Sequence, residues 1–274
     1  MKAMILAAGK GERLRPVTEQ LPKALVEVAG VSLLERHLFA LRDSGIREVV
    51  INLGWHGEQI LQRVGSGERY GLEVTYSPEG DNILETGGGI QRALPLLGSA
   101  PFWVINADVY TDYRLSAVSL AAEQLGHLVL VPRPAHRPDG DFGLVDGRVT
   151  NGPERHYTFS GIALYRPELF AGHEPGRFPL APLLRQAAQS SLLGGELYAG
   201  AWHDVGTPER LAELNRGVSE NLRAGLPAVR QRCARQSLTL PAARAAAVVE
   251  SRQACRRRQV DAGRSSADSH SRRD

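Results

Sequence analysis

Short apolar segments alternate with segments of helical periodicity through the first half of the chain. The apolar runs that read as strands are residues 3–6, 49–53, 72–76, 102–106 and 128–131. The segments that read as helices are residues 33–41, 59–64, 89–97 and 115–124. Because the strands are almost uniformly apolar, helices must cover both faces of their sheet. The pattern predicts a three-layer α/β fold around a mainly parallel sheet, with ligands beyond the carboxyl ends of the strands.

The second half of the chain has a different texture. Residues 132–138 are rich in proline and arginine, turn-rich pieces follow, and an apolar run covers residues 157–165. We expect antiparallel strands here, together with the pocket of a second substrate. Helical patterns return at residues 180–189 and 207–222, and the second of these opens with Thr207 as N-cap and Pro208 at the first helical position. The folded domain is expected to span residues 1–225.

The charge of the chain divides into two unlike regions. From residue 226 onward there are eleven arginines, no lysine and four acidic residues, a net charge of +7, which leaves −4 on residues 1–225. The composition of residues 226–274 predicts a disordered basic tail. Because the tail contains many arginines and no lysine, we also consider the hypothesis that it is translated from a shifted frame of GC-rich DNA. Resequencing of the locus would test this hypothesis. The basic tail therefore gives no indication that the folded domain binds nucleic acid.

Neither a membrane segment nor a disulfide framework is expected. The apolar run at the start of the chain is interrupted at Lys10, Glu12 and Arg13, so it is too short for a signal-peptide core or a membrane span. The two cysteines, Cys233 and Cys255, both lie in the basic tail. Neither disulfide bonds nor a zinc cluster can then organise the main domain. The default expectation is a cytoplasmic enzyme without a membrane partner.

A glycine-bearing loop directly after the first strand is the first candidate for a site. Residues 6–15 read LAAGKGERLR, and glycines allow successive backbone N–H groups to converge on an anion. The loop lacks the ending of a Walker loop and the third glycine of the dinucleotide fingerprint. Ten residues after Arg13, Lys23 follows a proline in an apolar context. Taken separately, the glycine-bearing loop is more often an ordinary turn and the lysine is more often a surface residue. The two features at this interval in the sequence are a much more specific indication of a phosphate-binding site.

Residues 6–18, LAAGKGERLRPVT, followed by Pro22 and Lys23, resemble the signature of the sugar-1-phosphate nucleotidyltransferase family. The departure at a defining position is Ala24, where the family has a second proline, and we expect it to affect loop rigidity without affecting the chemistry. The resemblance implies a Rossmann-like fold, here without a β-helix domain, that joins a nucleoside triphosphate to a sugar 1-phosphate and releases pyrophosphate. It also implies that Lys23 bridges phosphates of both substrates. The loop residues that it implies for nucleotide binding are Leu6, Ala7, Ala8, Gly9, Gly11, Glu12 and Arg13.

Two aspartates far apart in the sequence are the candidate metal ligands. Asp108 follows an apolar strand, and Asp204 precedes a helix start within the sequence WHDVGTP at residues 202–208. Taken alone, an aspartate after a strand caps a turn or helix as often as it binds a ligand. Mg²⁺ takes hard oxygen ligands, usually one or two carboxylates together with substrate phosphates. The family resemblance, including the hallmark Trp-x-Asp-x-Gly-Thr-Pro, implies that Asp108 and Asp204 bind Mg²⁺, and we expect the neighbouring His203 to pack or hydrogen-bond rather than act as a base.

Three successive glycines at residues 87–89 open a helical pattern, which is a costly choice unless the backbone approaches a ligand closely. The resemblance implies that this segment lies against the nucleobase, with Gly88 as the main contact and Glu79 as a second one. It further implies contacts to the sugar from Asn106, Asp141, Gly143, Glu154 and Gly161. Arg155 stands where the family often has lysine, which keeps the charge but changes the geometry.

The sequences GKGER at residues 9–13, LETGGGI at residues 84–90 and FSGI at residues 159–162 are typical of one branch of this family. Over residues 1–222 the chain resembles that branch, the short bacterial N-acetylmuramate 1-phosphate uridylyltransferases of cell-wall recycling, which implies UTP and N-acetylmuramate 1-phosphate as substrates. Muramate carries a lactyl carboxylate, and Arg155, Arg137 and His156 are its candidate partners, although each is more often a solvated side chain.

Other substrates and roles stay open on the sequence. Mannose-1-phosphate guanylyltransferase and glucose-1-phosphate thymidylyl- or uridylyltransferase are alternatives. An inactive homologue that binds a nucleotide sugar and regulates a partner is another, but it would be expected to lack Lys23 or one of the two aspartates, and all three are present. The sequence does not indicate an oligomeric state.

Overall fold

The computed structural model describes residues 1–80, 83–134 and 139–223. The predicted basic tail at residues 226–274 and the predicted domain end at residue 225 lie outside these ranges, as does the candidate carboxylate partner Arg137. Among the described residues, no helix combines the length and the hydrophobicity that crossing a membrane requires.

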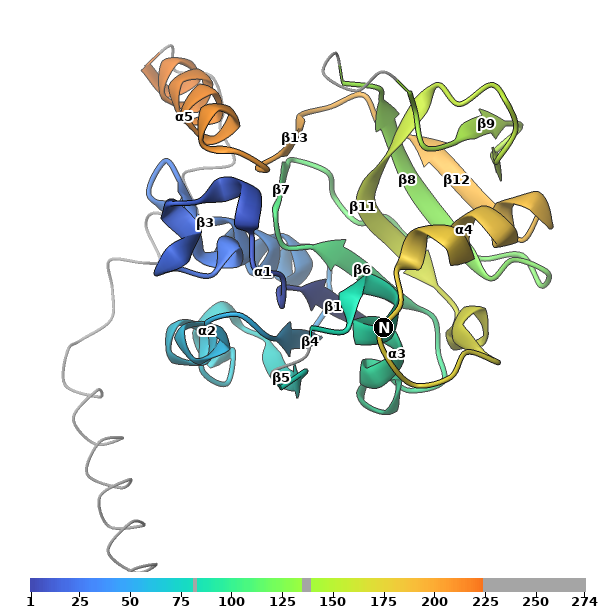
Figure 1. Ribbon diagram of the computed structural model, residues 1–274, viewed down its shortest axis with the longest axis horizontal. Helices are drawn as coiled ribbons and strands as arrows, with labels where there is room; N and C mark the ends of the chain where they lie inside the picture. Colours follow the sequence, from blue (N-terminus) through green and yellow to red (C-terminus); the bar gives the residue numbers. More distant parts are fainter. Residues whose placement is uncertain (81–82, 135–138, 224–274) are drawn as a thin grey trace, which may run out of the picture. The chain divides into compact units, whose positions relative to one another are not determined.

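A nine-stranded sheet forms the centre of the fold, with the strand order β5-β4-β1-β6-β11-β8-β12-β10-β9 (Figure 1). Seven of these strands run in one direction and only β11 and β10 are reversed, so the mainly parallel sheet is confirmed, as are the antiparallel additions in its second half. The strands are β1 (Lys2–Leu6), β4 (Glu48–Leu53), β5 (Glu73–Pro78), β6 (Phe102–Asn106), β8 (Gly126–Pro132), β9 (Gly143–Val145), β10 (Arg148–Thr150), β11 (Tyr157–Tyr165) and β12 (Leu193–Leu197).

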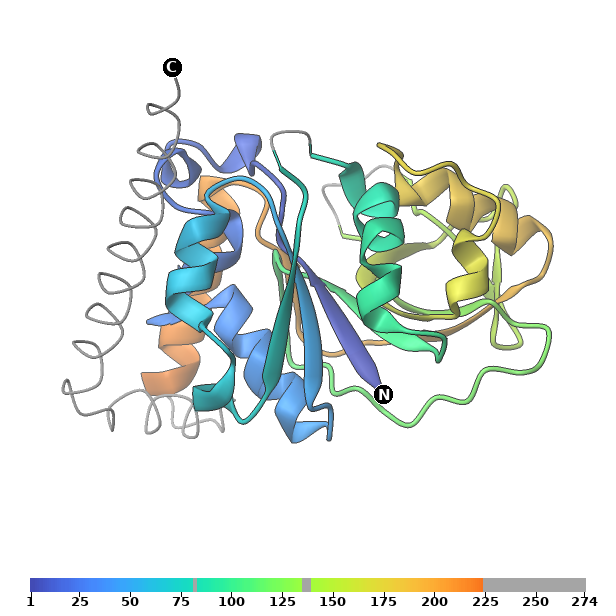
Figure 2. The same ribbon diagram turned by 90° about the horizontal axis from the view of Figure 1, so that it is seen from below.

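Helices cover both faces of the sheet, which confirms the three-layer arrangement (Figure 2). Helices α1 (Leu33–Asp43) and α2 (Gly57–Val64) lie on one face, and α3 (Glu85–Leu97) and α4 (Leu180–Gln189) lie on the other. Met4 of β1 belongs to the same buried cluster as Ile90 of α3 and Leu184 of α4. The strands are apolar on both sides because each side packs against a helical layer.

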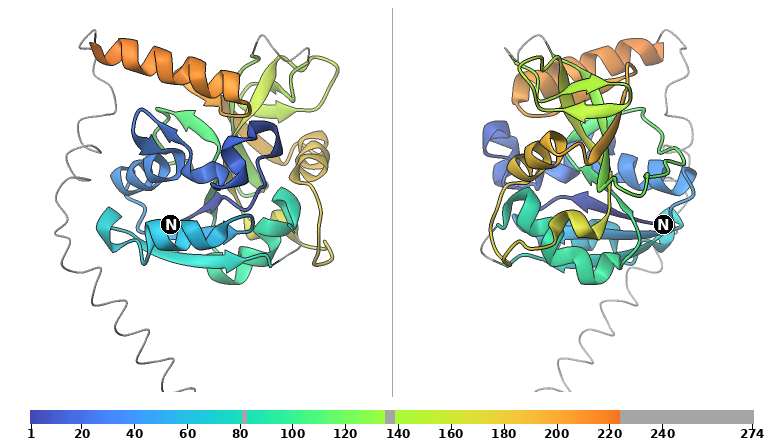
Figure 3. Two further views of the ribbon diagram at one scale, coloured as in Figure 1. Left: turned by 60° about the vertical axis from the view of Figure 1, so that its left-hand side comes forward. Right: turned by 90° about the vertical axis from the view of Figure 1, so that its right-hand side faces the viewer.

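A fifth helix, α5 (Pro208–Arg223), packs against the N-terminal part of the chain rather than against the large sheet (Figure 3). Leu214 and Val218 of α5 share a second buried cluster with Leu14, Val26 and Val205. The helix begins where the sequence predicted, with the side chain of its capping threonine accepting a hydrogen bond from the first turn at 3.4 Å. Two small sheets complete this region, β2 (Glu27–Val28) with β3 (Val31–Ser32) and β7 (Val109–Thr111) with β13 (Trp202–Asp204), together with the 3₁₀ helices η1 (Glu12–Leu14), η2 (Val17–Glu19), η3 (Lys23–Leu25), η4 (Glu68–Tyr70) and η5 (Pro167–Phe170).

The helix predicted at residues 115–124 is absent, and this prediction was wrong. None of these residues is buried, so the apolar residues of the segment do not form a stripe that packs on the sheet. Its backbone carbonyls find another partner, because Arg166 donates to the carbonyls of Gln124 at 2.9 Å and of Leu120 and Ala121 at 3.4 Å. Tertiary hydrogen bonds thus replace the intrahelical ones that the periodicity predicted.

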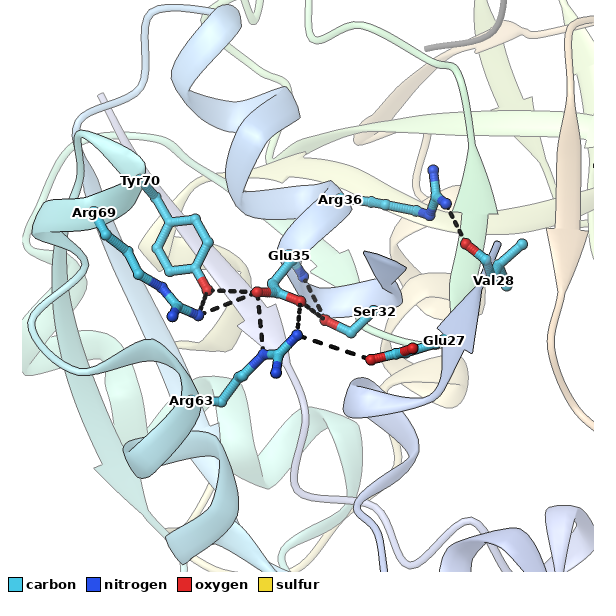
Figure 4. A network of polar contacts seen from close by, with 8 residues as sticks. All are labelled: Glu27, Val28, Ser32, Glu35, Arg36, Arg63, Arg69 and Tyr70. Carbon is cyan, nitrogen blue, oxygen red and sulfur yellow. Dashed lines mark hydrogen bonds and ion pairs between the residues drawn. The ribbon is translucent and has the colours of Figure 1, made fainter. Parts of the chain in front are cut away.

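A buried carboxylate ties three elements of the α1 face together (Figure 4). Glu35 of α1 is 9% exposed, and it accepts hydrogen bonds from Ser32 Oγ at 2.8 Å and from Tyr70 Oη at 2.9 Å. Arg63 of α2 donates to the same carboxylate at 2.9 Å, and Arg69 of η4 donates at 3.1 Å. Burial acts to raise the pKa of Glu35, but the hydrogen bonds from Arg63, Ser32 and Tyr70 outweigh it and hold the pKa below its ordinary value of 4.5.

The lowered pKa predicts that Glu35 makes stability depend on pH. A depressed folded-state pKa contributes stability above the unfolded-state value, and that contribution is lost as the pH falls through the folded-state pKa. We expect the free energy of unfolding of the wild type to exceed that of Glu35→Gln at neutral pH, and the difference to shrink below pH 4.5. Urea unfolding of both proteins across this pH range measures it, and a difference independent of pH would contradict the assignment.

Candidate active site

A cavity of about 190 Å³ opens at the carboxyl ends of β1, β4, β5 and β6. This is the sheet edge at which the sequence predicted ligands. The loop after β1 forms one wall, and residues at or just beyond the ends of the other strands form the rest together with the start of α3. The lining residues that carry the argument below are Leu6, Ala7, Ala8, Gly9, Lys23, Asn52, Glu79, Thr86, Asn106 and Asp108.

A chain of buried polar groups forms the inner wall of this cavity. Asn52 accepts a hydrogen bond from the backbone N–H of Ala7 at 2.7 Å and donates to Glu79 Oε1 at 2.6 Å. The other carboxylate oxygen of Glu79 accepts from the N–H of Leu84 at 2.7 Å. A Cβ atom at Gly89 would lie 2.6 Å from Glu79 Oε1, so this glycine makes room for the network. Glu79 and Asn52 are therefore held in place as fixed hydrogen-bonding groups before any ligand binds.

The glycines at the start of α3 are required by protein packing. A Cβ atom at Gly88 would collide with the carbonyl oxygen of Gly176, and one at Gly87 would collide with the ring of Phe178. The N–H groups of Gly87 and Gly88 both donate to the carbonyl of Phe178, at 3.0 and 3.1 Å. Thr86 and Glu79 line the cavity, whereas Gly88 does not belong to its lining. The structure thus supplies a packing reason for these glycines, and the contact of Gly88 with a nucleobase stays a prediction.

The loop after β1 is shaped by Gly11, which has the left-handed φ of +64°. A Cβ atom there would approach Thr18 Cγ2 to 2.9 Å and Lys23 Cβ to 3.2 Å. The hydroxyl of Thr18 donates to the carbonyl of Gly11 at 2.8 Å, which fixes the loop. Only a residue without a side chain fits this position at low cost, and the close packing brings Lys23 to the cavity wall. Glu12 and Arg13 are exposed at the rim of the loop.

The two predicted metal ligands are brought together across the small β7–β13 sheet. Asp204 pairs with Val109, and the N–H of Val205 donates to the carbonyl of Asp108 at 3.0 Å. Each carboxylate is paired with a cation. Lys23 Nζ lies 2.5 Å from Asp108 Oδ2, and Arg210 Nη1 lies 2.7 Å from Asp204 Oδ2.

The donor set fits a hard divalent cation. Asp108, in the turn before β7, and Asp204, at the end of β13, offer carboxylate oxygens, which are the ligands that Mg²⁺ prefers. Within the described ranges no group of three or more histidine, cysteine, aspartate or glutamate side chains is placed to hold a metal. A metal on these two aspartates would then take its other ligands from substrate phosphates and water, as is usual for Mg²⁺.

The predicted sugar-binding residues gather around an irregularity in β11. Its register against β8 shifts between Phe159 and Ile162, and Gly161 there has a φ of +81°. A Cβ atom at Gly161 would lie 2.6 Å from the side-chain amide of Asn106, so the glycine lets this cavity residue pack against the strand. Asp141 accepts from the N–H of Phe159 at 2.9 Å and holds the segment before β9 against the same bulge.

The remaining predicted sugar contacts lie beside this bulge. Gly143 is buried, and a Cβ atom there would lie 2.7 Å from the carbonyl of Glu154, so these two predicted residues are neighbours. Glu154 itself is exposed, Arg155 is half-buried and His156 is exposed. The indole Nε1 of Trp202 donates to the carbonyl of Ser160 at 2.9 Å, which joins the bulge to the strand that carries Asp204.

A model of the nucleotidyl transferase family matches residues 2–221. The chain belongs to the nucleotidyltransferase family. Among curated relatives, it is 48% identical to the N-acetylmuramate alpha-1-phosphate uridylyltransferase of Neisseria meningitidis over 78% of this chain and 96% of the relative. It is 32% identical to the protein of the same name from Caulobacter vibrioides over 76% of this chain and 92% of the relative. A solved UDP-glucose pyrophosphorylase complexed with UDP-glucose has the same fold, with a TM-score of 0.64 at 16% identity, over 80% of this chain and 98% of that structure.

The histidine beside the second aspartate of this nucleotidyltransferase packs against an aromatic ring. The His203 and Tyr110 ring centroids are 6.1 Å apart. Partial burial lowers the pKa of His203 below its ordinary value of 6.5, and the charge of Asp204 opposes that shift only in part. The ring is therefore neutral at pH 7, in line with the packing role that the sequence predicted.

Several residues at the site of this nucleotidyltransferase were not predicted from the sequence, among them Asn52, Thr86 and Arg210. Asn52 and Thr86 line the cavity, and Arg210 pairs with Asp204. A signal for Asn52 was available, since a polar residue stands inside the apolar strand at residues 49–53 and is only 3% exposed. Buried polar side chains need partners, which makes such a position a candidate for a site. Arg210 carried no comparable signal because arginine is common on exposed helix positions.

Substituting Gly161 with alanine is expected to impair the site of this nucleotidyltransferase. The new Cβ would clash with Asn106 and would also hold alanine in the left-handed region, at a cost of about 1–2 kcal/mol of stability. We expect a lower free energy of unfolding and a higher KM for the sugar phosphate, measured by urea unfolding and steady-state kinetics. Gly152→Ala is the matched control, because no atom lies within 4 Å of a Cβ there. Equal effects of the two variants would contradict the prediction.

Proposed function

We propose that this nucleotidyltransferase transfers a uridylyl group from UTP to N-acetylmuramate 1-phosphate, giving UDP-N-acetylmuramate and pyrophosphate. The observation that carries the proposal is the 48% identity to the meningococcal uridylyltransferase over 96% of its length. The spatial grouping of Lys23, Asp108 and Asp204 at one sheet edge supports a working catalytic site rather than an inactive homologue.

The proposed reaction is a single displacement. An oxygen of the sugar 1-phosphate attacks the α-phosphorus of UTP in line, the bond to the leaving pyrophosphate breaks, and no covalent enzyme intermediate forms. Both substrates are polyanions, so the protein must offset their repulsion and align them. Lys23 reaches the cavity wall and would bridge phosphates of the two substrates, while Arg13 at the loop rim would hold the triphosphate.

We further propose that the divalent metal is Mg²⁺, with Asp108 and Asp204 as its protein ligands. When bound, such an ion neutralises charge that develops on the phosphoryl oxygens. The two carboxylates would orient it between the loop after β1 and the β7–β13 sheet. Lys23, which pairs with Asp108, would supply positive charge beside the same phosphates.

The buried polar wall supports a nucleobase that has a ring N–H. Glu79 is 6% exposed and presents a carboxylate that Asn52 and Leu84 hold in place. A carboxylate accepts hydrogen bonds, so it suits the ring N–H of uracil and disfavours cytosine, which has an acceptor at the same ring position. Thymine and guanine share the ring N–H, so the choice of UTP rests on the relative and not on this contact alone.

A role in peptidoglycan recycling and a cytoplasmic location are part of this proposal. The product would be a nucleotide-activated form of a cell-wall sugar, and the relatives named above carry the same activity in their names.

The test is a grid of pyrophosphate release with Mg²⁺. Purified full-length protein is offered UTP, dTTP, GTP and CTP against N-acetylmuramate, glucose and mannose 1-phosphates. We expect one dominant signal from UTP with N-acetylmuramate 1-phosphate. Turnover confined to another pair would replace the substrates while keeping the reaction, and no turnover with any pair would favour the regulatory alternative.

A further inference from the structure

A second and larger cavity lies next to Asp204, on the side of the β7–β13 sheet that faces α5. Its volume is about 740 Å³, and its lining includes Trp202, Asp204, Arg133 and Arg210. The indole of Trp202 donates to the carbonyl of Ser160, the residue before Gly161, so one wall of this cavity lies next to the β11 bulge. A sugar held at the bulge would lie beside this wall.

The cavity is lined by two guanidinium groups and two carboxylates, so a divalent cation on Asp204 would leave it with an excess of positive charge. Arg133 and Arg210 contribute the guanidinium groups, and Asp204 and Glu213 contribute the carboxylates. Of the two arginines, Arg210 is the better placed, because its side chain is only 28% exposed whereas Arg133 is an exposed residue at the end of β8. A sheltered guanidinium binds a carboxylate more strongly than a solvated one because water competes less.

Binding of a divalent cation would weaken the ion pair between Arg210 and Asp204. Its Nη1 lies 2.7 Å from Asp204 Oδ2, on a carboxylate that is itself only 17% exposed. A divalent cation on Asp204 would repel the guanidinium beside it, since like charges at close range are unfavourable in a sheltered site. Arg210 stands in the first turn of α5 and lines the cavity, so a change of rotamer carries its guanidinium away from Asp204 and into that space.

We propose that Arg210 exchanges partners during the reaction: it neutralises Asp204 until a divalent cation binds there, and its guanidinium then binds the carboxylate of the sugar substrate in the cavity beside α5. This inference rests on the proposed function, because it assigns the residue that recognises the acidic substituent. It replaces Arg155 as the candidate for that contact. Arg210 then links binding of the metal to selection of an acidic sugar.

The first test measures metal binding without substrates. Free Mn²⁺ is followed by electron paramagnetic resonance in titrations of the wild type, Arg210→Met and Arg210→Lys. Removing the competing cation should tighten Mn²⁺ binding by Arg210→Met about fivefold, and Arg210→Lys should resemble the wild type. Unchanged or weaker binding by Arg210→Met would mean that Arg210 merely orients Asp204, which overturns the inference.

The second test measures selectivity for the carboxylate. The ratio of kcat/KM for N-acetylmuramate 1-phosphate over N-acetylglucosamine 1-phosphate, which lacks the lactyl group, should fall at least about tenfold in Arg210→Met. Arg216→Met, an exposed arginine on the same helix, is the matched control and should keep the wild-type ratio. A preference that survives in Arg210→Met but is lost in Arg155→Met overturns this inference alone. A wild type without any preference overturns the proposed function as well.

Discussion

Replacing Asp108 with alanine is expected to lower kcat/KM by at least roughly 10²-fold. The substitution removes one of the two carboxylates proposed to hold the metal. It also leaves Lys23, whose side chain is only 14% exposed, without the partner that lies 2.5 Å from its ammonium group. Lys23→Ala should cause a loss of the same size, because it removes the cation proposed to bridge the two anionic substrates. Initial rates of pyrophosphate release measure both.

The control for charge loss is Asp43→Ala at the end of α1, where the side chain is 48% exposed and pairs with Arg42. We expect near-normal turnover from this variant. Asp108→Asn keeps the size of the side chain while removing its charge, and should be impaired almost as strongly as the alanine variant. Near-normal turnover of Asp108→Ala or Asp108→Asn would contradict the assignment of Asp108 as a catalytic residue.

Glu35→Ala is expected to cause a large loss of stability for the substitution of a single polar residue. The change removes the acceptor for two arginines and for the buried hydroxyl of Tyr70, which is 2% exposed. A lost hydrogen bond to a charged group costs about 1.5–3 kcal/mol, and the arginines recover part of this because they are partly exposed. We therefore expect the free energy of unfolding to fall by about 2–3 kcal/mol.

Equilibrium urea unfolding measures this loss, with Glu58→Ala as the matched control. Glu58 lies on α2 with a 62% exposed side chain, and its removal should change stability by no more than about 0.5 kcal/mol. Similar losses for the two variants would show that the Glu35 network contributes little beyond surface charge.

The first half of the fold was predictable because its strands carry a strong and simple signal. Strands covered on both faces are apolar at every position, so β1, β4 and β6 stand out against amphipathic helices such as α1. The helix predicted at residues 115–124 was wrong because the periodicity of apolar residues does not show whether the fold offers a surface on which they can be buried. The interaction that decides its conformation comes from Arg166, more than forty positions away in the chain.

The candidate site was predictable where one residue type at one position carries the chemistry. Asp108 and Asp204 were predicted from their motifs together with the family resemblance, and the structure brings them together across β7 and β13, while their role as metal ligands stays a prediction. Asn52 and Arg210 were missed because their roles depend on neighbours in space. The glycines at residues 87–89 are a similar case. The sequence shows that another group must approach the backbone closely there, but it does not show which group that is.

The packing of α5 onto the N-terminal loop has a consequence for the order in which the site can be assembled. Asp204 lies on the strand that leads into α5, and α5 is fixed by Leu14 and Val26 near the start of the chain. The residues of α5 are synthesised after every strand of the large sheet, so Leu14 and Val26 lack their packing partners until the last part of the domain is made. A nascent or prematurely terminated chain can therefore form most of the sheet and still lack half of its proposed metal site, which makes the activity itself a check that the whole domain has been made.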